Sequence, residues 1–108
     1  MKMIVAVIHK DDAPEICQAL RDNEYMFTKL SSKGGFTRQG NCTLLIGIEE
    51  EKVEAVLREI RAHCAAREVD IPLMSFGDAQ VYDVNPMRTV TVGGATIFVL
   101  DVDHFEKV

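Results

Sequence analysis

The chain has 108 residues and a mass of 12.1 kDa, which fits one domain with a single hydrophobic core. Hydrophobic residues make up 47% of it and charged residues 27%, a composition that excludes a disordered or membrane-embedded chain. The formal net charge of −5 disfavours nonspecific binding to nucleic acid or to an anionic membrane, since both depend on clustered positive charge. We expect one domain over residues 1–108.

The first half of the chain predicts three strands and a helix. Residues 3–8 (MIVAVI) are a short apolar run rich in β-branched side chains, typical of a central strand buried on both faces. Residues 12–15 (DAPE) have the signature of a helix N-terminus, with Asp12 as the cap and the glutamate completing a capping box. Residues 25–31 and 41–48 are predicted as the second and third strands, joined by a glycine-containing loop.

The second half predicts one more helix and a final strand region. A helix is expected from about Glu49, where apolar residues begin to recur at helical spacing. Residues 68–88 contain prolines and a glycine without sustained periodicity, which indicates a long loop. Residues 89–92 and 95–102, separated by two glycines, predict a strand pair or one bent strand.

The predicted element order is β-α-β-β-α-β. With right-handed crossovers it gives an antiparallel sheet with both helices on one face, an α+β ferredoxin-like sandwich. The other face of the sheet stays bare. A chain of this size covers such a face most simply by packing against copies of itself, so we expect an oligomer.

The cysteines and the apolar runs of the sequence indicate where in the cell the protein is located. An odd number of isolated cysteines argues against a disulfide framework and a zinc site, so we expect reduced, mostly buried thiols at Cys17, Cys42 and Cys64. No apolar run approaches the length of a membrane span, and the N-terminus lacks a signal-peptide layout. The expected location is the cytoplasm.

Several ligand-binding features lie close together between Thr28 and Asn41. Two adjacent glycines can form a nest of backbone N–H groups for an anion, and a phenylalanine offers a stacking face for a nucleobase. Together with nearby hydroxyl, amide and cationic groups, the glycine pair and the phenylalanine suit the binding of a phosphate-bearing purine. The residues are Thr28, Lys33, Gly34, Gly35, Phe36, Thr37, Arg38 and Asn41. A glycine pair alone is most often only a turn, and no established phosphate motif is present.

Three blocks, in order, resemble the cyclic di-AMP receptor family of PII-like proteins. They are residues 1–7 (MKMIVAV), 28–47 (TKLSSKGGFTRQGNCTLLIG) and 92–99 (VGGATIFV), and the resemblance extends over essentially the whole chain. It implies a PII-like ferredoxin-fold subunit, a homotrimer, cyclic di-AMP bound in clefts between neighbouring subunits, and no catalysed reaction. Because small sensors signal through ligand-dependent ordering of loops, we expect a relay to an unidentified downstream protein.

The resemblance also implies roles by position. Thr28 would contact phosphate, Asn41 would read an adenine edge, and Gly47 would pack close to a base. The remaining residues of the implied ligand site are Tyr25, Met26, Gly35, Phe36, Thr37, Arg38 and Phe98.

Two positions depart from the family pattern. Met26 stands where the family usually has an arginine, and Thr37 where it commonly has a leucine. Loss of one charge-assisted hydrogen bond to phosphate weakens binding by roughly 10- to 150-fold unless another cation compensates. Lys29, Lys33 and Arg38 are the nearby candidates. The alternative is a PII-like trimer that binds another adenine nucleotide or only a protein partner.

An enzyme would need a nucleophile with a base, a carboxylate pair or a metal cluster. His9, His63 and His104 are far apart in the sequence, and Cys42 lies in an apolar strand where a buried thiol is inert. We predict no catalytic residue, no metal site and no cofactor, with cyclic di-AMP as the suspected ligand.

Overall fold

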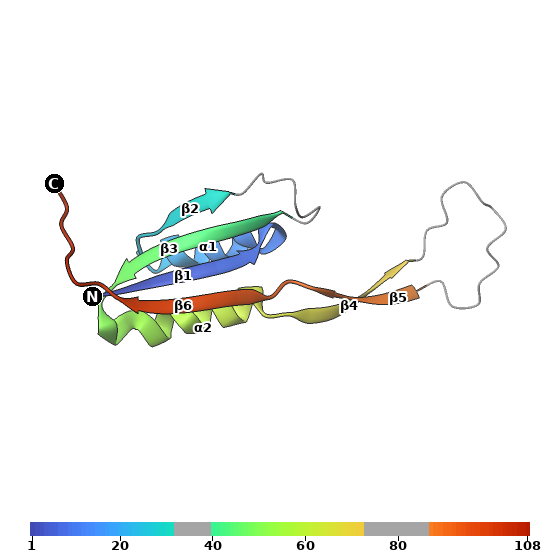
Figure 1. Ribbon diagram of the computed structural model, residues 1–108. Coiled ribbons are helices and arrows are strands. Elements are labelled where there is room, and N and C mark those ends of the chain that lie inside the picture. The colour runs from blue at the N-terminus through green and yellow to red at the C-terminus, as the bar shows by residue number, and fades with distance from the viewer. Residues whose placement is uncertain (32–39, 73–86) are drawn as a thin grey trace.

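The structure, a computed structural model, describes residues 1–31, 40–72 and 87–108. Its elements are β1 (Lys2–His9), α1 (Ala13–Asp22), β2 (Thr28–Ser31), β3 (Asn41–Ile48), α2 (Val53–Cys64), β4 (Arg67–Pro72), β5 (Met87–Val92) and β6 (Ala95–Asp101). Single 3-10 turns precede the two helices. A four-stranded antiparallel sheet has the order β2-β3-β1-β6, and β4 pairs with β5 in a separate two-stranded sheet (Figure 1). The predicted ferredoxin-like fold is confirmed.

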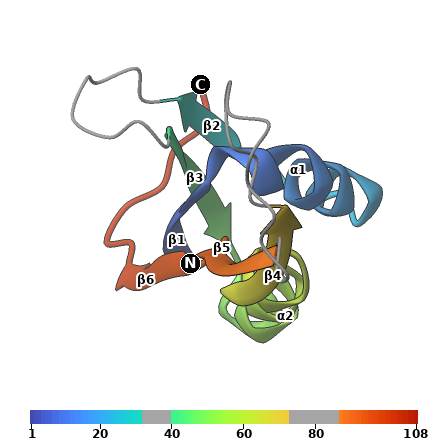
Figure 2. The ribbon, with the colours of Figure 1, turned by 90° about the vertical axis from the view of Figure 1, so that its right-hand side faces the viewer.

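β1 occupies the predicted central position, between β3 and β6. Its even-numbered residues from Ile4 to Ile8 are buried, whereas its odd-numbered residues from Met3 to Val7 are only half-buried. Successive side chains of a strand point to opposite faces, and both helices cover the same face of the sheet (Figure 2). The prediction of a strand buried on both faces is therefore wrong for the single chain.

One hydrophobic core lies between the two helices and the sheet. The predicted apolar stripes of both helices face it, and the three thiols are buried as predicted. The fully buried helix residues are Ile16 and Leu20 from α1, and Val56, Ile60 and Cys64 from α2. Helical spacing therefore located the core-facing side chains correctly.

The end of α1 directs the chain into β2. Glu24 has a φ of 60°, its N–H donates to the Arg21 carbonyl at 2.9 Å, and the Tyr25 N–H donates to the Leu20 carbonyl at 2.9 Å. These two bonds define a Schellman ending, which reverses the chain direction. The strand predicted from Tyr25 begins at Thr28 instead, because Tyr25 belongs to the helix ending.

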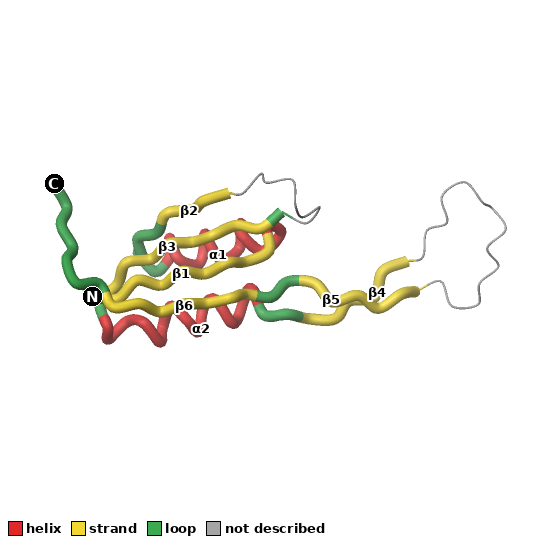
Figure 3. The backbone as a smooth tube through the Cα atoms, in the orientation of Figure 1, coloured by secondary structure: helices red, strands yellow, loops and turns green. Residues whose placement is uncertain are grey.

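β4 and β5 form a ribbon, here called the arm, that extends beyond the end of the main sheet (Figure 3). The prediction of one long loop over residues 68–88 is wrong at both ends, because backbone pairing runs from Arg67 opposite Val92 to Pro72 opposite Met87. Residues 73–86 lie outside the described part of the chain.

Of the two arrangements predicted around Gly93, a strand pair and one bent strand, the structure excludes the pair. β5 pairs with β4 and β6 pairs with β1, so the two segments do not pair with each other. Gly93 and Gly94 have φ values of 76° and 105°, a left-handed backbone that other residues rarely adopt. The glycines separate a strand of the arm from a strand of the main sheet.

Asp12 fixes the base of the arm. Its side chain is 5% exposed, and its Oδ1 accepts a hydrogen bond from Arg67 Nη2 at 2.9 Å. It makes no side-chain capping bond, so the predicted capping box is wrong; a guanidinium is a stronger donor than a backbone N–H. A Cβ at Gly93 would lie 2.7 Å from Arg67 Nη1 and 3.0 Å from Asp12 Oδ2, so this contact requires glycine.

The Asp12–Arg67 pair predicts unequal effects of its two single substitutions. Arg67→Met should lower the free energy of unfolding by about 1 to 3 kcal/mol, because it leaves a buried carboxylate without its partner. Asp12→Asn should lower it less, since the Arg67 side chain is 49% exposed and water can solvate it. Urea denaturation of both single variants and the double variant measures the difference. Equal losses would contradict the prediction.

Candidate functional site

The face of the main sheet opposite the helices, here called the open face, carries rows of apolar side chains. Directly paired residues of neighbouring strands share a face, so the strand register defines these rows. One row is Thr28, Leu45, Val5 and Phe98, and the next is Gly47, Met3 and Leu100. Phe98 and Leu100 are 52% and 51% exposed, so the face predicted to be bare is bare in this chain.

A cavity of about 360 Å³, the first cavity, lies over the Gly47 end of the open face. Leu45 and Gly47 of β3 line it together with Met26 and Thr28. The C-terminal segment, residues 102–108, supplies another wall: it leaves β6 and runs toward β2 on the side of the sheet away from the helices (Figure 2). Met26, Thr28 and Gly47, which the sequence assigns to a ligand, therefore meet in one cavity.

The chain entering β2 alternates between the core and the solvent. Tyr25 and Phe27 pack against the core, whereas Met26 is 69% exposed and Thr28 is exposed. Arg21 of α1 lies over the Phe27 ring, 5.5 Å from its centroid, and holds this segment from the helix side. A smaller adjoining cavity of about 230 Å³ is lined by Tyr25 and Met26, among other residues.

Gly47 keeps the first cavity open. A Cβ built at this position meets no atom of the described residues within 4 Å, and the φ of Gly47 is not in the left-handed region. Neither packing within the described part of the chain nor backbone conformation requires glycine here. A side chain at position 47 would instead occupy the space of the cavity.

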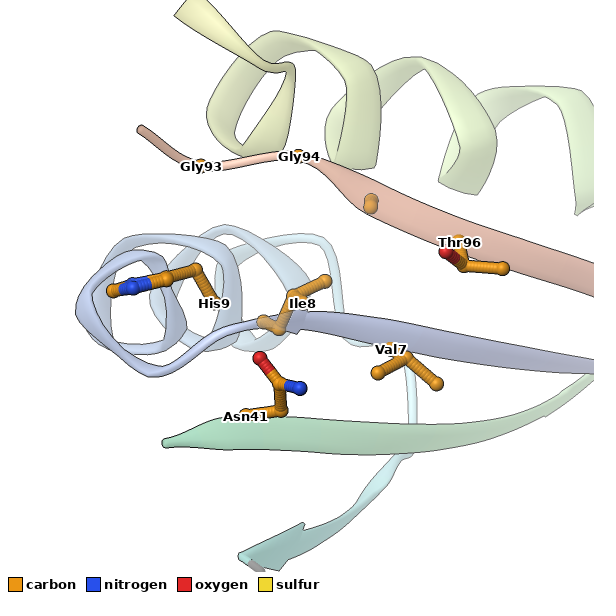
Figure 4. Close-up of a pocket in the computed structure, with 8 residues that line it drawn as sticks. Val7, Ile8, His9, Asn41, Gly93, Gly94 and Thr96 are labelled. Atoms are coloured by element: carbon orange, nitrogen blue, oxygen red, sulfur yellow. The ribbon is translucent and has the colours of Figure 1, made fainter. Parts of the chain in front are cut away.

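A second cavity of about 390 Å³ lies at the opposite end of the sheet (Figure 4). Asn41, His9 and Thr96 line it beside Gly93, and the Asn41 amide extends from β3 toward β1. Six residues of extended strand separate Asn41 from Gly47, which is about 20 Å. Within one chain the two predicted site residues therefore line different cavities.

The remaining predicted site residues are not brought into these cavities. Phe98 shares the row of Thr28 on the open face but lines none of the three cavities. Gly35, Phe36, Thr37 and Arg38 lie outside the described residues, as does Lys33.

The structure adds lining residues that the sequence reasoning missed. Met3 and Leu45 follow from the two-residue period of β1 and β3 once the open face is identified. Phe105 and Lys107 belong to a stretch without a strand or helix pattern, so only the path of the C-terminal segment places them.

The comparisons with known proteins identify similar sequences and structures. A family model described as "Cyclic-di-AMP receptor" matches residues 1–108. The crystal structure of a functionally unknown protein from Pediococcus pentosaceus ATCC 25745 is 37% identical in sequence and superposes with a TM-score of 0.79. The match covers 99% of this chain and 96% of that chain, so the likeness extends over both molecules.

The thiols are poorly suited to nucleophilic chemistry. Burial, with a smaller contribution from the Asp12 carboxylate, raises the pKa of the Cys64 thiol to about 12. Burial also raises the pKa of Cys17 and Cys42 above that of a free thiol.

The described residues contain no group of three or more His, Cys, Asp or Glu side chains placed to hold a metal. Neither described helix has the length and apolar content needed to cross a membrane.

The raised thiol pKa values predict slow alkylation of the folded chain. At pH 8 a thiol with a pKa near 12 has roughly one thiolate in 10⁴ molecules, and only the thiolate reacts. Cys64 should therefore resist iodoacetamide at pH 8 in the native protein and react in 8 M urea. Cys17 and Cys42, whose pKa values burial also raises, should react more slowly in the native protein than in urea. Intact-mass spectrometry counts the modified thiols. Rapid native labelling of one cysteine would instead reveal an activated nucleophile.

Proposed function

The chain belongs to the cyclic di-AMP receptor family, and from that premise we propose that it is a non-enzymatic sensor that binds cyclic di-AMP in clefts between the subunits of a homotrimer. One observation carries the proposal. Met26, Thr28 and Gly47 come from two strand regions and line one cavity on the open face. The resemblance to the family implies the same three residues as part of the ligand site.

The chemistry of the first cavity suits an adenine nucleotide. Its volume of about 360 Å³ falls within the range of small-molecule sites, which combine apolar walls with a few polar groups. Leu45 and Met3 offer an apolar floor, Thr28 offers a hydroxyl, and Phe105, 61% exposed, offers an aromatic face for stacking. Purine rings and a phosphate would both find partners there.

The open face supports the proposed trimer. Leu30, Phe98 and Leu100 expose about half of their surface on this one face, and exposed apolar side chains of this kind are typical of an interface. The separation of Asn41 and Gly47 within one chain agrees with clefts to which neighbouring subunits contribute different residues.

We also propose that ligand binding is relayed by a rearrangement of residues 33–39 or 68–88, of which 33–39 and 73–86 lie outside the described residues. The second cavity supports this relay because it lies between Asn41, beside the first segment, and Gly93, at the base of the arm. A ligand group in that cavity would contact Asn41 and Gly93. A protein partner that reads the rearranged segment would complete the signal.

Met26 favours a second candidate function. A thioether cannot form the bidentate hydrogen bonds that an arginine makes with phosphate. The chain would then be a PII-like trimer that has lost cyclic di-AMP binding and takes another adenine nucleotide or only a protein partner. The cavity itself does not distinguish between adenine nucleotides.

Isothermal titration with cyclic di-AMP tests the proposed function. The wild-type protein should bind saturably, and Gly47→Ala should weaken binding by about 5- to 150-fold because its methyl group fills the cavity. The same substitution should leave the fold intact, since the methyl group meets no atom of the described residues. Thr43→Val is the matched control: Thr43 lies on the same strand and face but lines none of the three cavities.

Titrations with ATP and AMP separate the two candidate functions. Saturable binding of either one, with no heat from cyclic di-AMP, would replace the first function by the second. Equal binding of cyclic di-AMP by wild type and Gly47→Ala would remove the first cavity from the ligand site.

Sedimentation tests the trimer. Phe98→Glu places a charge on the open face and should convert a species of three chains into single chains, because a buried unpaired carboxylate destabilises an interface. Val99→Glu is the control, since Val99 is 43% exposed on the same strand but points to the opposite face. A wild-type protein that sediments as a monomer would contradict the proposed assembly.

A further inference from the structure

The charged side chains around the first cavity are few and come from one segment. Among the side chains that line it only those of Glu106 and Lys107 are charged, and both belong to the C-terminal segment. Glu106 lies with Oε1 3.9 Å from His104 Nε2, a contact within the segment itself. Lys107 forms no ion pair or hydrogen bond with any residue that the structure describes. Lys107 lines the cavity together with Met26 and Thr28.

Two other cations in the described part of the chain near β2 fit the role less well, and Lys33 and Arg38 lie outside it. Lys29 pairs with Leu44, a fully buried core residue, so its side chain leaves β2 on the helix side and not on the open face. Lys52 lines the smaller adjoining cavity, where Glu24 and Glu49 also lie and Thr28 does not. An anion there would face two carboxylates.

The C-terminal segment has room to respond to a ligand. Its attachment within the described residues is one backbone hydrogen bond, from the Val102 N–H to the Met1 carbonyl at 3.3 Å. Phe105 is 61% exposed although it lines the cavity. A ligand phosphate between Thr28 and the segment would give it a further attachment.

We propose that Lys107 supplies the phosphate-binding cation that Met26 cannot, so that the C-terminal segment closes the nucleotide site together with Thr28. This inference rests on the proposed function. The Thr28 hydroxyl would donate a hydrogen bond to a phosphate oxygen, and the Lys107 ammonium would form a charge-assisted hydrogen bond to the same group. An ammonium on a flexible stem reaches such a group from a segment that is not a strand.

Titration of four proteins with cyclic di-AMP tests the role of Lys107. Lys107→Gln should weaken binding by about 10- to 150-fold, the effect of losing one charge-assisted hydrogen bond. Lys29→Gln, the matched control on the helix side of β2, should stay within about twofold of wild type. Met26→Arg combined with Lys107→Gln should recover most of the lost affinity, because a guanidinium then enters the same cavity from β2.

The outcomes separate this inference from the function on which it rests. Binding by wild type that is undiminished in Lys107→Gln overturns the role of Lys107 and leaves the sensor function in place. Equal weakening by Lys29→Gln, or no recovery in the Met26→Arg combination, also overturns it. No binding by wild type overturns both proposals. Circular dichroism of each variant verifies that these exposed substitutions leave the fold unchanged.

Discussion

The antiparallel pairing of β1 with β3 on one side and β6 on the other is the constraint on which the rest of this structure depends. It places every second residue of three strands against the helices and the residues between them on the open face. A register shift of one residue would exchange the two sets. The core, the apolar surface proposed for assembly, and the floor of the first cavity are therefore consequences of one pairing pattern.

At the base of the arm, a distant hydrogen-bond partner of one side chain replaces the local partner that the sequence predicts. Asp12 occupies the capping position of α1, but its carboxylate binds Arg67, 55 residues later in the chain. Its second oxygen is buried without a hydrogen-bond partner among the described residues. The buried, unpaired oxygen costs free energy, and it lies where α1, β4 and Gly93 meet. The position of the arm is therefore coupled to the helix beneath it.

Local patterns predicted the main sheet and both helices, because alternation and helical spacing depend on neighbours within a few residues. The pairing of Asp12 with Arg67 and the hairpin of the arm depend on contacts between distant residues, which local signals do not encode. The candidate site divides in the same way: Met26, Thr28 and Gly47 meet as the β2–β3 pairing requires, whereas Lys107 reaches the cavity only through the course of an irregular segment.

Gly93 and Gly94 connect the arm to the main sheet, so a change in their backbone angles would displace the outer end of the arm. Each strand of the arm has six residues, a length of about 20 Å. A rotation of about 10° at the glycines would move the outer end of such a strand by about 3 to 4 Å. Because the second cavity touches these glycines, a displacement too small to alter the core would be enlarged at the far end of the arm, where Pro72 pairs with Met87.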